Sequence, residues 1–192
     1  MGKIVITANV SLDGVVQDPD GQEDFSRGGW FVRHGGRDLD EWGKVEYEEA
    51  LATAALLLGR RSEEWFGARW ASRSGGFADR LNSLPKYVVS STLRDPRWTN
   101  VTVLSGSAAD EVAALREQVQ GDIVVYGSYQ LARTLIEHEL ADELRLIVFP
   151  VVVGAGERLF GQTTGARPFR LTSSRTIGSG LAFLSYEIAR DA

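Results

Sequence analysis

The chain has 192 residues, 43% of them hydrophobic, and a formal net charge of -5 at pH 7. A length of this order suits one core, so we expect a single domain over residues 1–192. The negative charge disfavours nucleic acid and anionic membranes as partners. The absence of cysteine excludes disulfides and thiolate chemistry, and no apolar run has the length of a leader or a membrane span. We therefore expect a cytoplasmic protein.

In the first half of the chain, apolar runs of strand length alternate with stretches of helical periodicity, a pattern typical of an α/β domain with a mainly parallel sheet. Residues 17–37 form a long insert between the first expected strand and the first expected helix. Residues 69–76, rich in Ser, Arg and Gly, are expected to form a loop. The expected strands cover residues 3–10, 54–58, 86–90 and 101–104, and the expected helices cover residues 38–53 and a stretch that begins near Ser62.

The second half continues the alternation and then changes character. Ser107 and Asp110 resemble a capping box for a helix that reaches Gln120. We then expect a strand over 122–126, a helix over 129–140 and a long strand over 143–153 that is interrupted at Pro150. The segments 169–177 and 181–189 flank Gly178-Ser179-Gly180, so the chain is expected to close with an antiparallel hairpin.

The segment Gly59-Arg60-Arg61-Ser62 follows an apolar run and precedes a helical stretch. Glycine lets the backbone approach a ligand closely, and Ser62 can cap the helix or donate its hydroxyl. A guanidinium meets a phosphate with two parallel hydrogen bonds, which a lysine ammonium does not offer. The segment thus suggests a phosphate site, although a strand end followed by solvated arginines has the same sequence pattern.

Two further junctions follow expected strands. Ser90-Ser91-Thr92 presents three hydroxyl groups, although a plain polar turn before Arg94 would account for it, and Gly127-Ser128 leads into the next helix. Because the carboxyl ends of parallel strands meet at one edge of a sheet, we expect the three junctions to share a ligand there. Hydroxyls, backbone N–H groups and arginines together suit an elongated ligand with several phosphates.

An ordered set of motifs carries a family resemblance: Ser11-Leu12-Asp13-Gly14, Leu57 to Ser62, Val88 to Thr92, Tyr126-Gly127-Ser128, and Asp142 to Leu146 with Pro150 to Gly154. The chain resembles the dihydrofolate reductase superfamily from Ile4 to about Glu187, and more narrowly the branch that contains the reductase domain of bacterial riboflavin biosynthesis, the C-terminal domain of the bifunctional deaminase-reductase. The resemblance implies an α/β, three-layer fold with a central, mainly parallel sheet of about eight strands, an antiparallel C-terminal strand, helices on both faces and bound NADPH.

The resemblance also assigns residues to NADPH. Arg60, Arg61 and Ser62 would hold the pyrophosphate and the 2′-phosphate, and Ala8 would meet the nicotinamide amide through its backbone, while Val15 or Val16 covers the ring. The full set implied for the cofactor is Ala8, Val16, Gly59, Arg60, Arg61, Ser62, Ser90, Ser91, Thr92, Gly127, Ser128, Tyr129, Gln130 and Leu131.

The proton donor is not fixed by any motif. Dihydrofolate reductases place a carboxylate on the first helix, and Asp38, Asp40 and Glu41 occupy that neighbourhood here, although each suits a solvated helix start equally well. Asp13 is better anchored by the resemblance, yet an Asp-Gly turn is just as readily structural. Asp13, Asp38 and Asp40 are the catalytic candidates.

Asn9, Trp30 and Phe149 are the candidates for substrate contacts. Trp30 either stacks on a planar ring or fills a core. The two histidines, His34 and His138, are too few for a metal site, so no metal is expected.

These features favour an NADPH-dependent reductase that transfers a hydride to a C=N or C=O bond of a small planar, pterin- or pyrimidine-like, or sugar-derived molecule. A non-catalytic NADPH-binding protein or sensor is the alternative from another class. A 5-amino-6-(5-phosphoribosylamino)uracil reductase is an alternative enzyme, although the sequence has no second basic cluster for the substrate's phosphate. The C-terminal strands are apolar and could pair across a two-fold axis, and proteins of the branch that the chain resembles often form dimers, so we expect a homodimer.

Overall fold

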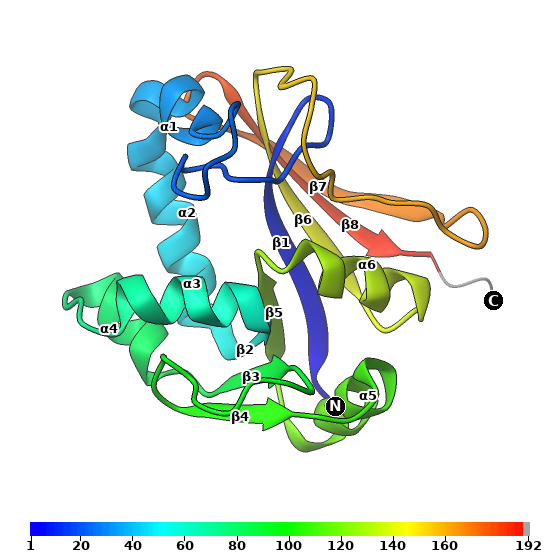
Figure 1. Ribbon diagram of the computed structural model, residues 1–192. Helices are drawn as coiled ribbons and strands as arrows, with labels where there is room; N and C mark the ends of the chain where they lie inside the picture. Colours follow the sequence, from blue (N-terminus) through cyan, green and yellow to red (C-terminus); the bar gives the residue numbers. More distant parts are fainter. Residues whose placement is uncertain (190–192) are drawn as a thin grey trace. The chain divides into compact units, whose positions relative to one another are not determined.

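The computed structural model describes residues 1–189, in which eight strands form one sheet in the order β4-β3-β2-β5-β1-β6-β8-β7 (Figure 1). The strands are β1 (Lys3–Ser11), β2 (Thr53–Gly59), β3 (Lys86–Val89), β4 (Val101–Leu104), β5 (Asp122–Tyr126), β6 (Glu143–Phe149), β7 (Phe169–Ile177) and β8 (Leu181–Ile188). The helices are α1 (Trp30–Gly35), α2 (Leu39–Ala52), α3 (Arg60–Trp70), α4 (Gly76–Ser83), α5 (Ala108–Gln118) and α6 (Tyr129–Glu137), with a 3₁₀ turn over Gly36–Asp38. The predicted α/β class is confirmed.

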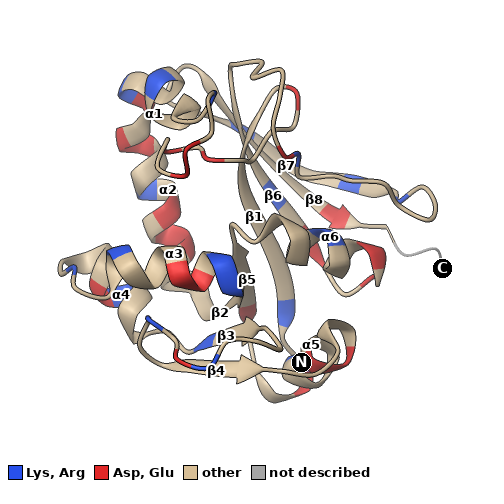
Figure 2. Cartoon of the chain, in the orientation of Figure 1, with Lys and Arg blue, Asp and Glu red and all other residues tan. Residues whose placement is uncertain are grey.

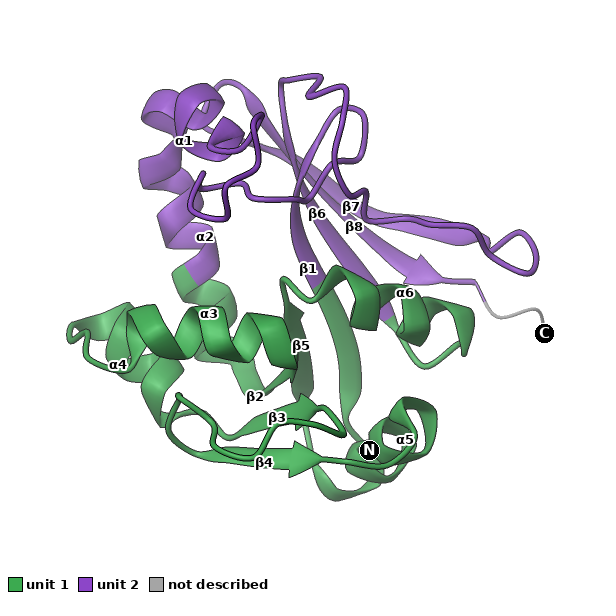
Figure 3. Ribbon diagram, viewed as in Figure 1, with its two compact units in different colours: residues 1–6, 47–142 green, residues 7–46, 143–192 purple. Residues whose placement is uncertain are grey.

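The chain divides into two compact units (Figure 3). Unit 1 contains Met1–Ile6 and Tyr47–Asp142, and unit 2 contains Thr7–Glu46 and Glu143–Ala192. Both units are discontinuous in sequence, since β1 and α2 each contribute residues to both. The expectation of a single domain remains a prediction.

Unit 1 contains the parallel part of the sheet. β3 pairs in parallel with β2 and with β4, and β2 pairs in parallel with β5. Leu58 pairs with Val88 and Gly59 with Val89, so these two strands end side by side. The segments that follow β2 and β3 therefore leave the sheet at the same edge.

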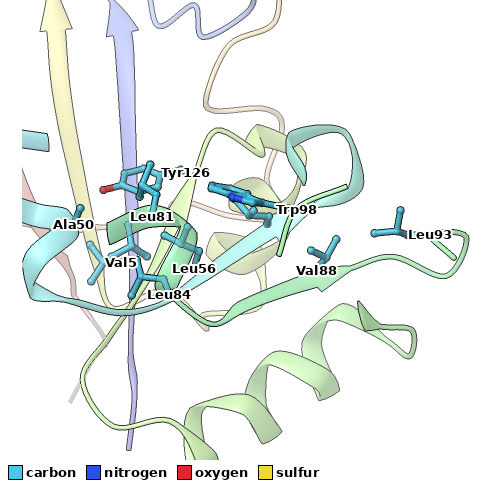
Figure 4. Packing of buried hydrophobic residues seen from close by; sticks show 11 residues of the cluster. Val5, Ala50, Leu56, Leu81, Leu84, Val88, Leu93, Trp98 and Tyr126 are labelled. Carbon is cyan, nitrogen blue, oxygen red and sulfur yellow. The ribbon is translucent and has the colours of Figure 1, made fainter. Parts of the chain in front are cut away.

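A cluster of buried side chains fills one face of unit 1 (Figure 4). Leu56 and Leu58 of β2 and Val124 and Tyr126 of β5 belong to it, and Phe66 and Trp70 of α3 pack against it. Strand side chains alternate between the two faces, so Ile123 and Val125, also buried, project from the opposite face. The buried apolar residues of α5 and α6, which are Val112, Leu115, Leu131, Ala132, Leu135 and Ile136, are available to cover it.

Unit 2 contains the antiparallel end of the sheet, where β8 pairs with both β6 and β7. This arrangement confirms the predicted C-terminal hairpin. Trp30, Ile147 and Phe149 are central to the core of unit 2, and Leu39 and Trp42 from the start of α2 pack against it.

The structure corrects four local expectations. Residues 30–35 form α1 inside the insert, and α4 begins at Gly76, where a loop was predicted to end. The long strand stops at Phe149, because Pro150 has no N–H to continue a ladder. Ser107 is the N-cap of α5 but makes no side-chain capping bond; Glu111 Oε1 instead accepts the N–H of Gly106 at 2.9 Å.

No helix within residues 1–189 combines the length and the apolar character that a membrane span requires.

Candidate cofactor site

The segment Gly59 to Ser62, predicted from the sequence to form a phosphate site, spans the end of β2 and the start of α3. Gly59 is the N-cap, with extended backbone (φ -86°, ψ 162°), and Arg60 is already the first helical residue, two positions earlier than predicted. Arg60 and Arg61 are exposed, and the ribbon at the start of α3 is blue in Figure 2, the colour of Lys and Arg. Arg60 Nη1 lies 3.7 Å from Glu64 Oε1, a solvent-exposed pairing that an anionic ligand can displace at small cost.

Ser62 joins the start of α3 to the start of α6. Its Oγ accepts the backbone N–H of Ser128 at 3.0 Å. Ser128 Oγ in turn accepts the N–H of Gly59 at 3.0 Å and donates to the carbonyl of Tyr126 at 3.1 Å. The first and third predicted junctions are therefore connected by hydrogen bonds within unit 1. The N-cap of α3 is Gly59 rather than Ser62, and the O–H proton of Ser62 takes no part in this network.

The backbone at Gly127 and Ser128 is unusual. Both residues lie in the left-handed region, with φ of 57° and 54°. A Cβ at Gly127 would lie 3.3 Å from Ser62 Oγ, so glycine is favoured there by both conformation and space. Left-handed backbone is uncommon for a serine, and conformations of this kind concentrate at ligand sites.

The residues that open α6 differ in what they offer a ligand. Leu131 is buried in the core, so it presents its backbone alone to the surface. Gln130 is exposed, and the ring of Tyr129 lies beneath the guanidinium of Arg133 at 5.1 Å. Ser128 makes no side-chain capping bond to α6. The positive end of this helix is thus available to an anion.

The segment after β3 forms a closed turn. Ser90 Oγ accepts the backbone N–H groups of Thr92 at 3.2 Å and of Leu93 at 3.0 Å. Ser90 therefore shapes the turn, whereas Ser91 and Thr92 are exposed. Both the polar-turn interpretation and the ligand interpretation are compatible with this geometry.

In unit 2, Asp13 holds a loop together. Its carboxylate accepts hydrogen bonds from Ser11 Oγ at 2.7 Å, from the N–H of Val153 at 2.9 Å and from the N–H of Gly154 at 2.8 Å. Partial burial acts to raise the pKa of Asp13, but the hydrogen bonds outweigh it and lower the pKa to about 2. A carboxylate with these contacts stays ionised and donates no proton near neutral pH.

Asp38 and Asp40 also lie in unit 2. Asp38 ends the 3₁₀ turn, and its two carboxylate oxygens accept the N–H groups of Ser179 at 3.0 Å and of Gly180 at 2.7 Å. It thereby fastens the tip of the β7–β8 hairpin. Asp40 lies in the first turn of α2 and is exposed.

The candidate substrate residues belong to the core of unit 2 or border it. Trp30 is 2% exposed, donates its Nε1–H to the carbonyl of Gln17 at 3.0 Å and meets Phe149 edge to face. These contacts match the core-filling alternative. Asn9, half-buried at the end of β1, accepts the Nε1–H of Trp42 at 2.9 Å. Phe149 is fully buried.

The two remaining cofactor candidates, Ala8 and Val16, are half-buried in unit 2. Val16 donates its N–H to the carbonyl of Glu157 at 2.9 Å, and the adjacent Val15 is fully buried. Of the pair proposed to cover the nicotinamide ring, Val16 is the one with exposed surface.

The residues of unit 1 fit a phosphorylated dinucleotide. Two exposed guanidiniums, a glycine where a side chain would occupy the surface, and an uncapped helix start lie on hydrogen-bonded segments. Sequence reasoning missed one buried polar residue beside them, Glu63, because an acidic residue in a first helical turn is ordinarily solvated. Residues 1–189 contain no cluster of three or more His, Cys, Asp or Glu able to hold a metal ion.

Comparison with known proteins gives consistent results. The profile of the family described as RibD C-terminal domain matches residues 2–183. The uncharacterized protein YyaP of Bacillus subtilis is 25% identical over 189 residues, covering 96% of this chain and 94% of the relative. The uncharacterized protein YwjB of the same organism is 25% identical over 183 residues, covering 93% and 94%.

Solved structures share the fold. A putative riboflavin biosynthesis protein from Shewanella sp. PV-4 aligns with a TM-score of 0.77 at 20% identity, covering 98% of this chain and 99% of that one. Dihydrofolate reductase from Enterococcus faecalis, complexed with NADP(H), aligns with a TM-score of 0.64 at 16% identity, covering 98% of both chains. RibD from Acinetobacter baumannii aligns with a TM-score of 0.68 at 13% identity over 99% of this chain and 59% of that longer protein.

Proposed function

Because this chain belongs to the RibD C-terminal domain family, we propose that it is an NADPH-dependent reductase acting on a C=N or C=O bond of a small planar or sugar-derived molecule. The family membership supports reductase chemistry. We further propose that the protein prefers NADPH to NADH.

One observation supports the cofactor above all others: Arg60 and Arg61 lie exposed in the first turn of α3, beside a junction that Ser62 connects to Gly127-Ser128. NADPH differs from NADH only by the 2′-phosphate, so a preference for NADPH requires cations for that group. Arginines provide them with two parallel hydrogen bonds each. The backbone N–H groups at the start of α6 suit the pyrophosphate.

Each residue then has a defined task. Arg60 and Arg61 neutralise phosphate charge, the O–H of Ser62 donates to a phosphate oxygen, and Gly59 keeps the surface free of a side chain. Ser91 and Thr92 contribute hydroxyls at the adenosine end, where the 2′-phosphate is attached. NADPH, when bound, supplies the hydride. In unit 2, Ala8, Val16 and Asn9 remain proposed contacts of nicotinamide and substrate.

The decisive experiment combines binding with turnover. The melting temperature of the protein is measured with NADPH, with NADH and without cofactor, and NADPH consumption is then followed at 340 nm against a panel of aldehydes, ketones, cyclic imines and dihydropterins. A rise in melting temperature with NADPH alone, together with steady consumption on one panel member, is the expected result. Equal shifts with the two cofactors would refute the assignment of the arginines.

A non-catalytic NADPH-binding protein is the second candidate, and one observation favours it. Asp13 and Asp38, two of the three candidate acids, have carboxylates that accept backbone N–H groups, which leaves exposed Asp40 as the one without such a bond within residues 1–189. In this alternative NADPH binds tightly and is not consumed. Binding without oxidation across the whole panel would favour it over the enzyme.

A further inference from the structure

Glu63 is a buried carboxylate in the first turn of α3, three positions after Arg60 and next to Ser62. Its side chain is 0% exposed, and Oε1 accepts the backbone N–H of Trp98 at 2.8 Å. The second oxygen, Oε2, is also buried and has no hydrogen-bond partner among residues 1–189. Burying a carboxylate with one oxygen unsatisfied is costly, so stability alone gives little reason to place an acid here.

The contact between α3 and Trp98 is reinforced one turn later. A Cβ at Gly67 would lie 2.8 Å from both Arg97 Cβ and the backbone nitrogen of Trp98, so only glycine allows this approach. The rings of Phe66 and Trp98 stack with centroids 5.6 Å apart. Glu63, Phe66 and Gly67 thus hold the end of the 90–98 segment against α3.

The 90–98 segment begins at Ser90-Ser91-Thr92, the second junction predicted to contact the cofactor, and ends at Trp98. At its start, Ser90 Oγ closes the turn through the N–H groups of Thr92 and Leu93. At its end, the Trp98 N–H is bound by Glu63. The turn of α3 that carries the two arginines is therefore hydrogen-bonded to the third junction, by Ser62 to Ser128, and to the far end of the segment that follows the second junction, by Glu63 to Trp98.

We propose that Glu63 is a positioning residue for cofactor preference: by binding the Trp98 amide it holds the 90–98 segment in place relative to Arg60 and Arg61, so that both sides can contact one 2′-phosphate. The inference rests on the proposed function and deepens it. Loss of the bond frees the segment and weakens recognition of the 2′-phosphate, whereas the rest of the dinucleotide keeps its contacts. Glu63 itself is buried and touches neither cofactor nor substrate.

Three variants separate positioning from mere stability. Glu63→Leu removes the acceptor, Glu63→Gln keeps an oxygen for the Trp98 amide, and Gly67→Ala displaces the same segment without touching the carboxylate. Glu111→Leu is the matched control, because Glu111 also accepts a backbone N–H, that of Gly106, elsewhere in unit 1. Gly43→Ala controls for the glycine change, since a Cβ there meets nothing within 4 Å.

Dissociation constants are measured for NADPH, NADH, adenosine 2′,5′-bisphosphate and AMP, together with hydrogen–deuterium exchange at the Trp98 amide. We expect Glu63→Leu and Gly67→Ala to weaken NADPH and the bisphosphate about tenfold, the effect of one lost hydrogen bond to a charged group. NADH and AMP affinities are expected to stay unchanged, Glu63→Gln to recover wild-type NADPH binding, and the two controls to have no effect.

If both variants fold, exchange the Trp98 amide faster and still bind NADPH and NADH as the wild type does, the inference is overturned while the proposed function survives. If the wild type shows no NADPH preference and the arginine variants change nothing, the proposed function fails together with the inference. Should Glu63→Leu fail to fold, Gly67→Ala gives the same test with the carboxylate intact.

Discussion

The backbone N–H of Gly59 donates to Ser128 Oγ at 3.0 Å, whereas a Cβ on Gly59 would meet that oxygen only at 3.8 Å. The backbone of Gly59 is extended, a conformation that any residue adopts, and the added carbon would make ordinary van der Waals contact. Neither strain nor crowding within residues 1–189 therefore requires glycine at this position. A ligand that approaches the backbone would require it.

The variant Gly59→Ala tests whether a ligand approaches the backbone at this position. We expect the free energy of unfolding to stay the same or to rise by about 0.4–1 kcal/mol, because alanine reduces the freedom of the unfolded chain. NADPH affinity is expected to fall about tenfold or more as the methyl group meets the ligand. Urea unfolding and calorimetric titration measure the two quantities. Unchanged NADPH affinity would remove Gly59 from the cofactor site.

Arg60→Ala and Arg61→Ala test the charge-assisted contacts. Each lost bond to a phosphate is expected to cost about 1.5–3 kcal/mol, or about 10- to 150-fold in NADPH affinity, with little change for NADH. Arg170→Ala and Arg175→Ala are the matched controls, because each removes one positive charge from β7. Equal losses for the two cofactors in the α3 variants would contradict contact with the 2′-phosphate.

Asp13→Asn separates the structural from the catalytic interpretation of this residue. An asparagine presents one oxygen and one NH₂ group, so either Val153 N–H or Gly154 N–H loses its acceptor, and we expect destabilisation of about 1–3 kcal/mol. Because the pKa of Asp13 is lowered from 3.8 to about 2 in the folded protein, the wild type should lose this stabilisation as the pH falls from about 4 to 2.

The measurement is urea unfolding of both proteins at pH 6, 4 and 2.5. The stability difference between wild type and Asp13→Asn should shrink as the pH falls. A fully stable Asp13→Asn protein that binds NADPH but turns over no substrate would instead identify Asp13 as a catalytic residue.

Lys86, in unit 1, gives the protein a second pH dependence, in the alkaline range. The side chain is 0% exposed, its Nζ donates to the carbonyls of Asn82 and Leu84, and it lies 4.6 Å from the centre of the Trp98 ring. Burial lowers the pKa of Lys86 from 10.5 to about 8. Between these values the unfolded chain binds more protons than the folded one, so stability should rise with pH.

Relative to Lys86→Met, the wild type should therefore gain on the order of 1–2 kcal/mol between pH 8 and 9.5. The comparison cancels the titration of other groups, and guanidinium unfolding at the two pH values measures it. A constant difference between the two proteins would show that Lys86 keeps its ordinary pKa.

Strand positions were largely predictable because alternation and turn residues determine them. β4 and β5 have the predicted bounds, and α6 begins at the predicted Tyr129. α1 and α4 were not predictable from local pattern: α1 has only six residues and begins with the buried Trp30, whereas α4 starts with Gly76 inside a stretch rich in turn formers. Tertiary burial of Trp30, Ala78 and Leu81 stabilises both helices against weak intrinsic propensity.

The candidate site was likewise predictable only in part. Residue types and order indicated Gly59 to Ser62 and Gly127-Ser128, and the structure joins them through Ser62 Oγ. The partner of each carboxylate was not predictable, because Asp13 and Asp38 accept amides from residues 140 or more positions away. Likewise, no local pattern distinguishes Glu63, which is buried, from its neighbour Glu64, which pairs with Arg60 at the surface.

The division of the chain into units made of separate segments has a consequence for biosynthesis. Every residue of unit 1 has been added once the ribosome passes Asp142, whereas unit 2 still lacks β6, β7 and β8. The parallel strands of unit 1 and the turn that carries the arginines can thus associate before β6, β7 and β8, the partners of Thr7–Glu46, have been synthesised. In a nascent chain stalled before Glu143, Thr7–Glu46 would therefore lack the strands against which it packs in unit 2.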